Sequence, residues 1–143
     1  MADYYTKFSV VLNLPDENAQ EYALNLANQA CQIRFDDTPP ADFPKELAEV
    51  LESWYFETDA NCSGEAGLWL HSEEGGIDAV CAFIQHLLQK FDPTTQVTFE
   101  WSNDCSKPRT DAYGGGAAII TALSIKTMNT GQWLQQNASP VTK

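Results

Sequence analysis

The stretch Ile77-Asp-Ala-Val-Cys-Ala-Phe-Ile-Gln-His-Leu-Leu-Gln-Lys-Phe91 decides the fold, because it holds the clearest structural period in the chain. Its apolar residues recur at steps of three and four, which predicts a helix with one buried face. Gly75-Gly76 leads into this helix and Asp92-Pro93 ends it. Apolar segments at 68–70 and 97–101 flank the helix, and we expect both to be strands.

The segments further out complete an α+β pattern. Alternating apolar residues predict a strand at 8–14, and Pro15-Asp16-Glu17 then opens a helix. The other predicted elements are a second helix at 44–56, a polar loop at 58–66, a hairpin at 117–128, a short helix capped by Asn129 or Thr130, and a frayed tail from 137. This order predicts one α+β domain of 143 residues, with a mainly antiparallel sheet and helices packed on one face.

The charge of the chain is concentrated in its first half. The sequence has 20 acidic and 8 basic side chains, which gives a net charge of −12. Residues 1–75 carry all of this net charge, and residues 36–65 hold nine acids and a single lysine. Binding to a nucleic-acid backbone needs clustered cations, so the composition predicts no direct contact with nucleic acid.

Four carboxylates in and before the predicted 44–56 helix form a candidate surface for a partner. They follow at steps of three and four, so most of them share one side of a helix. One interpretation is a solvated face that keeps the protein soluble. The other is an acidic surface that binds a basic protein or imitates a nucleic-acid backbone, with an exposed aromatic anchor. The candidate contacts are Asp42, Glu46, Glu49, Glu52 and Trp54.

The segment 101–116 supports an alternative function, because unlike chemical groups are crowded into it. We expect a long loop here, in which consecutive glycines allow a close approach to a ligand or to a neighbouring segment. The candidate anion-binding residues are Lys107, Arg109, Gly114, Gly115 and Gly116, and the nearby cations make Cys105 a candidate reactive thiol. The structural alternative is a loop in which Arg109 bridges Asp104 or Asp111.

A second candidate for chemistry is His71, which follows the predicted 68–70 strand and precedes Glu73 and Glu74. An imidazole beside carboxylates is suited to acid–base catalysis, and with Cys105 nearby it would form a thiol–imidazole pair. The alternative is an exposed loop with acids at a helix start. We expect His86 to be solvated, since it lies opposite the apolar stripe of the 77–91 helix.

Several classes of protein are not indicated. The four cysteines contain no C-x-x-C pair, so the spacing predicts no metal site, and we expect no cofactor. The first residues lack a basic segment followed by an apolar stretch, and no run is long enough to span a membrane. These features predict a cytoplasmic protein with no membrane contact.

The second half of the chain resembles a family of small bacterial proteins, some of them plasmid- or phage-borne. The resemblance rests on Cys105-Ser-Lys-Pro-Arg109, Asp111, Tyr113-Gly-Gly-Gly-Ala117 and Met128-Asn-Thr130 followed by Trp133-Leu134. It covers residues 66–136 and implies a bacterial or mobile-element setting, without implying an activity. Together with the acidic first half, it predicts a non-enzymatic accessory or inhibitor protein that binds a basic partner.

Overall fold

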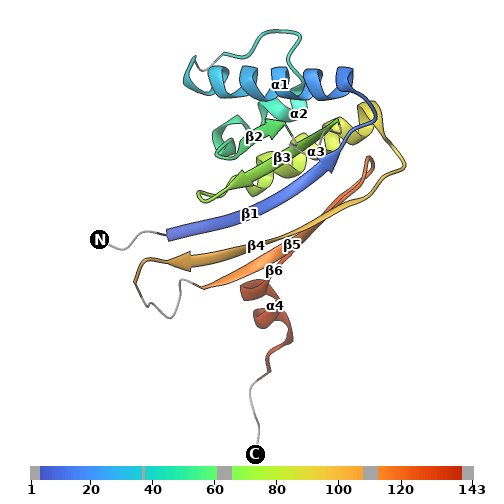
Figure 1. Cartoon of the computed structure of the whole chain (residues 1–143). Coiled ribbons are helices and arrows are strands. Elements are labelled where there is room, and N and C mark those ends of the chain that lie inside the picture. The colour runs from blue at the N-terminus through green and yellow to red at the C-terminus, as the bar shows by residue number, and fades with distance from the viewer. Residues whose placement is uncertain (1–3, 37, 61–65, 108–112, 140–143) are drawn as a thin grey trace, which may run out of the picture.

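One six-stranded antiparallel sheet forms the frame of the protein in this computed structural model, with the strand order β2-β3-β1-β4-β5-β6 (Figure 1). The structure describes residues 4–36, 38–60, 66–107 and 113–139. The strands are β1 (Tyr4–Asn13), β2 (Glu57–Ala60), β3 (Gly67–Ser72), β4 (Val97–Cys105), β5 (Gly114–Ile120) and β6 (Ile125–Asn129). The helices are α1 (Glu17–Asp36), α2 (Lys45–Ala48), the short 3-10 turn η1 (Leu51–Ser53), α3 (Ile77–Phe91) and α4 (Thr130–Asn137).

The sheet has one buried face and one open face. Side chains alternate between the two faces along each strand, so Phe8, Val10 and Leu12 of β1 enter the core while Ser9 and Val11 do not. The buried residues of the strands join those of α1 and α3 in a single hydrophobic cluster. The predicted α+β class, with a mainly antiparallel sheet and helices packed on one face, is therefore confirmed.

Helix α3 has the bounds that its apolar period predicts, Ile77–Phe91. Its face toward the sheet is fully buried. Its N-terminal cap is Gly76, which has a left-handed conformation with φ 87°. A Cβ at Gly76 would lie 2.9 Å from the carbonyl oxygen of Ser53, so only glycine lets the η1 turn pack this closely. Within the described residues, no helix combines the length and apolar character that crossing a membrane requires.

The predicted 44–56 helix is wrong in its length. The helix α2 ends at Ala48, η1 covers Leu51–Ser53, and the chain is extended by Glu57. Leu47, Leu51 and Trp54 are spaced as on one face of a helix. Trp54 and Phe56, however, are both buried, and a spacing of two residues is that of an extended chain. Because the two aromatic rings pack on Phe83 of α3, the extended arrangement prevails, and part of the predicted 58–66 loop becomes β2.

The long loop predicted after 101 is also shorter than expected. Strand β4 continues to Cys105 and β5 already begins at Gly114, opposite Asn103. Gly116 faces Trp101 across the ladder, and a Cβ at Gly116 would overlap the Trp101 ring and the carbonyl of Met128. At this position the glycine therefore makes room for an indole ring from the neighbouring strand.

Substitution of Gly116 by alanine should destabilise the fold by about 1–3 kcal/mol, the usual cost of overpacking. A matched control is Gly131→Ala, since a Cβ there meets no atom closer than 3.7 Å and lies in helix α4. Urea unfolding of both variants compares the two sites. Equal stabilities of the two variants would contradict this account of the glycine.

Candidate functional site

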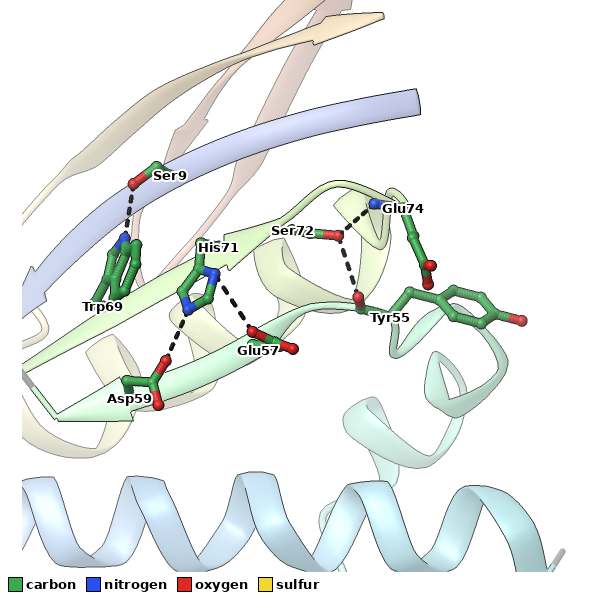
Figure 2. A network of polar contacts seen from close by, with 8 residues as sticks. All are labelled: Ser9, Tyr55, Glu57, Asp59, Trp69, His71, Ser72 and Glu74. Atoms are coloured by element: carbon green, nitrogen blue, oxygen red, sulfur yellow. Dashed lines mark hydrogen bonds and ion pairs between the residues drawn. The ribbon is translucent and has the colours of Figure 1, made fainter. Parts of the chain in front are cut away.

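The strands β2 and β3 carry a cluster of polar and aromatic side chains on the open face of the sheet (Figure 2). In their antiparallel register Glu57 is opposite His71, and Asp59 is opposite Trp69. Residues directly or diagonally opposite on one face lie within side-chain contact. The alternation of the two strands thus brings two carboxylates, an imidazole and an indole together.

His71 is held by ring stacking and by a hydrogen bond to a carboxylate. Its Nε2 lies 2.7 Å from Oδ2 of Asp59, and its Nδ1 lies 3.6 Å from Oε2 of Glu57. The rings of His71 and Trp69 are stacked with centroids 3.7 Å apart, and Nε1 of Trp69 donates a hydrogen bond of 2.7 Å to Oγ of Ser9. A carboxylate only accepts hydrogen bonds, so Nε2 of His71 is the donor in the 2.7 Å contact with Asp59.

A pocket of about 310 Å³ opens beside His71, and three of its six lining residues are glutamates. The lining residues are Tyr55, Glu57, His71, Ser72, Glu73 and Glu74. We call this the His71 pocket. Glu57, Glu73 and Glu74 are exposed, and Tyr55 is 50% exposed. The pocket is therefore rich in negative charge and is bordered by an aromatic ring.

The glutamate side of the His71 pocket is fixed by backbone hydrogen bonds. The buried Ser72 donates from Oγ to the carbonyl of Tyr55 at 3.1 Å and accepts from the amide of Glu74 at 2.9 Å. The amide of Thr6 donates to the carbonyl of Glu73, and Gly75 donates back to the carbonyl of Thr6. Strand β1 and Tyr55 therefore hold the Glu73–Glu74 backbone in place.

A second hollow of about 490 Å³ adjoins the His71 pocket and is more apolar. The two share His71, Ser72 and Glu73, while Trp69 contributes aromatic surface to the hollow alone and Lys7 also lines it. Trp69 is 40% exposed, so its ring is available at the surface. An acidic pocket thus borders an aromatic one on the same face of the sheet.

The predicted acidic surface is altered by the break in the helix. Asp42, Glu49 and Glu52 are exposed, but they lie on three different short segments instead of one helix face. Trp54 is 1% exposed and packs against Phe56 and Phe83, so the predicted aromatic anchor offers no surface to a partner. The exposed aromatic residue is its neighbour Tyr55, which borders the His71 pocket.

Among the described residues, Glu46 is the carboxylate of the predicted surface that contacts a basic side chain. Its Oε1 accepts a hydrogen bond of 2.8 Å from Nδ1 of His86, whose Nε2 lies 2.8 Å from the hydroxyl of Tyr22. Hydrogen bonding from its own backbone amide and from His86 lowers the pKa of Glu46, whereas burial and the Glu46 charge raise the pKa of Tyr22. The expectation that His86 is solvated is wrong, because only 13% of its side chain is exposed.

The residues of the alternative anion site are not brought together with His71. Cys105 is opposite Tyr4 and His71 is opposite Ser9, five residues further along β1 and on the other face of the sheet. Five residues of a strand span about 17 Å, so no thiol–imidazole pair forms. Gly114, Gly115 and Gly116 belong to β5 and Lys107 is exposed beyond β4, whereas Arg109 lies outside the described residues.

Sequence reasoning found His71 but missed the two carboxylates that lie against it. Glu57 and Asp59 were expected in or before a loop, because residues 44–56 fit a helix. A usable signal was present: Glu57-x-Asp59 and Trp69-x-His71 are both spaced by two, which places each pair on one face of a strand. The register that pairs β2 with β3 depends on packing elsewhere in the chain.

The lowered pKa of Glu46 predicts a pH-dependent contribution to stability. The charged form is favoured in the folded state, so this stability is present above the usual pKa of 4.5 and is lost as the pH falls through the lower folded value. Because about half of the Glu46 side chain is exposed, we expect its ionisation to contribute less than about 1 kcal/mol to the free energy of unfolding. The difference in unfolding free energy between the wild type and Glu46→Gln should shrink at acid pH, and a constant difference would contradict the assignment.

Comparison with known proteins gives no relative from which a function could be taken. No model of a protein family, no curated protein and no solved structure matches the chain significantly. The resemblance of its second half to small bacterial proteins therefore stays a prediction. A function has to be inferred from the geometry of the His71 pocket.

Proposed function

We propose that this chain is a non-enzymatic binding protein that captures a basic protein partner through the His71 pocket. In this proposal the partner inserts a lysine or arginine side chain between Glu57, Glu73 and Glu74. The aromatic ring of Tyr55 lies at the border of the pocket, where it can cover the inserted cation. The proposed setting is the bacterial cytoplasm.

The observation that carries the proposal is the gathering of three exposed glutamates and a half-exposed tyrosine around one pocket of about 310 Å³. Carboxylates form charge-assisted hydrogen bonds with lysine and arginine, and a guanidinium also stacks on aromatic rings. Among the described residues, no basic side chain forms an ion pair with Glu73 or Glu74. Their charge is therefore available to a partner.

The adjoining hollow suggests what lies next to the cation in the partner. It presents the half-exposed ring of Trp69 near Glu73, with Lys7 also in its lining, which suits an apolar side chain close to the lysine or arginine. A net charge of −12 would also accelerate the approach of a basic surface, and salt would weaken that attraction. The proposed recognition element is thus a basic residue followed by an apolar one.

The sequence resemblance supports a more specific form of the proposal. If the chain belongs to a bacterial mobile element, its role is that of an accessory or inhibitor protein that occupies a basic surface of its partner. The same acidic charge disfavours phosphate backbones, which supports a protein and not a nucleic acid as the ligand.

The test is capture of basic proteins from a bacterial lysate by an immobilised triple variant, Glu57→Gln with Glu73→Gln and Glu74→Gln. We expect the proteins that the wild type retains at low salt to be lost from this variant. High salt should release them from the wild type, because the attraction is electrostatic. Thermal melting of the triple variant should remain within a few degrees of the wild type.

The matched control removes the same number of charges elsewhere, with Asp42→Asn, Glu49→Gln and Glu52→Gln. This variant has the same net charge as the pocket variant, so ion exchange alone would weaken both equally. Capture that persists in the control but not in the pocket variant supports the His71 pocket. Equal loss in both variants, or loss in the control alone, contradicts it.

A specific arrangement also favours a second candidate function, the binding of a divalent transition metal ion. Glu57, Asp59 and His71 each offer one ligand atom, and these atoms lie within 4.8 Å of one another. Imidazole and carboxylates together suit ions such as Zn²⁺ or Mn²⁺. The sequence does not predict this set, since the spacing of the cysteines indicates no metal site.

Thermal melting with added Zn²⁺ tests the metal candidate, since a ligand that binds only the folded state raises its melting temperature. We expect a rise for the wild type and for His86→Gln, and none for His71→Gln. The chain has two histidines, so His86→Gln is a matched control for loss of an imidazole. The same rise in both histidine variants would contradict a site at His71.

A further inference from the structure

The strand β6 is an open edge of the sheet. Among the described residues it pairs with β5 on one side and has no strand on the other. All five of its side chains are exposed. An edge strand presents unpaired backbone donors and acceptors to any further strand that can reach it.

The surface around β6 is also apolar to an unusual degree. Helix α4 follows β6 directly and has no buried residue, although it contains a tryptophan and a leucine. The exposed apolar residues here are Leu123 (95% exposed), Ile125, Met128, Trp133 and Leu134. Helix α4 lies beside β6, away from the helices α1, α2 and α3 (Figure 1). This C-terminal surface therefore has the make-up of an interface core.

Charge indicates what kind of partner fits this surface. Residues 113–139 contain no acidic side chain and a single base, Lys126, in a chain whose net charge is −12. A basic partner gains little attraction there, whereas two copies of this acidic chain would repel each other least at this surface. The opposite edge strand, β2, carries Glu57 and Asp59, which would oppose pairing between copies.

From these observations we propose that two copies of the chain associate by antiparallel pairing of their β6 strands, which joins the two sheets into one. The contact is twofold symmetric, so each copy contributes the same residues. This inference is independent of the His71 pocket, which lies at the other end of the sheet.

The hydrogen bonds of the β5–β6 hairpin determine which residues of β6 are free to pair with a second copy. The amide of Thr121 donates to the carbonyl of Ser124, and ladder hydrogen bonds then recur at every second pair. The backbone groups of Lys126 and Met128 therefore face β5, and those of Ile125, Thr127 and Asn129 face outward. A twofold ladder centred on Thr127, the middle residue of β6, pairs the two strands over their full length, whereas a ladder centred on Ile125 or Asn129 pairs only part of them.

This register is self-complementary. Lys126 falls opposite Met128 of the second copy, so the two lysines are not paired with each other. Continuing the ladder past Asn129 brings the start of α4, which carries Trp133 and Leu134, beside Leu123 of the second copy. The most exposed leucine of each chain therefore lies near the start of the apolar helix of the other.

Sedimentation velocity of the wild type and of Thr127→Lys over a wide concentration range tests the proposal. We expect the wild type to shift from 15.9 kDa to twice that mass as concentration rises, and Thr127→Lys to remain monomeric because two lysines would meet at the centre. Thr98→Lys is the matched control, since it adds the same charge to the exposed open-face side of β4. This control should still dimerise.

A cysteine at Thr127 gives a second readout that does not depend on the charge. Directly opposite residues in a hydrogen-bonded antiparallel pair have Cα atoms about 5.5 Å apart, which suits a disulfide. We expect oxidised Thr127→Cys to form a dimer linked through residue 127, as mapped by mass spectrometry. A monomeric wild type at every concentration, or a dimer that survives Thr127→Lys, would overturn the proposal.

Discussion

The packing of Trp54 and Phe56 on Phe83 is the constraint on which the candidate site depends. The Trp54 and Phe56 rings lie 4.9 Å apart, and Phe83 of α3 meets them at 5.3 and 5.8 Å. Because two residues separated by one are both buried, the chain between them is extended and the residues beside them face outward. Tyr55 and Glu57 are exposed for this reason, and β2 follows in the register that places Asp59 near His71.

The acidic residues of the candidate site lie outside the core. The core is apolar and is shared by the sheet and the helices, whereas Glu57, Asp59, Glu73 and Glu74 are exposed to water. The His71 ring contacts both carboxylates of β2. Glu73 and Glu74 extend into water from a backbone that is held by Ser72 and Thr6.

The sequence correctly predicts the elements whose apolar residues follow a single repeat, either helical or alternating. Helix α3 has its predicted bounds, and β5 and β6 form the hairpin predicted at 117–128, because these patterns admit one interpretation. Residues 44–60 admit two, a helical step from Leu47 to Trp54 and an alternation from Trp54 onward, and tertiary packing on Phe83 decides between them. Gly115 and Gly116 likewise depend on Trp101, a residue of another strand that local sequence does not indicate.

The two edges of the sheet differ in charge, and this difference assigns a different proposed partner to each edge. The β2 edge carries carboxylates and faces the proposed cationic ligand, whereas the β6 edge is free of acids and faces the proposed second copy. Pairing at β6 leaves the two His71 pockets at the far ends of a continuous sheet, where neither blocks the other. Two pockets on one rigid frame would bind a partner with repeated basic sites more tightly than one pocket, with no new contact in either.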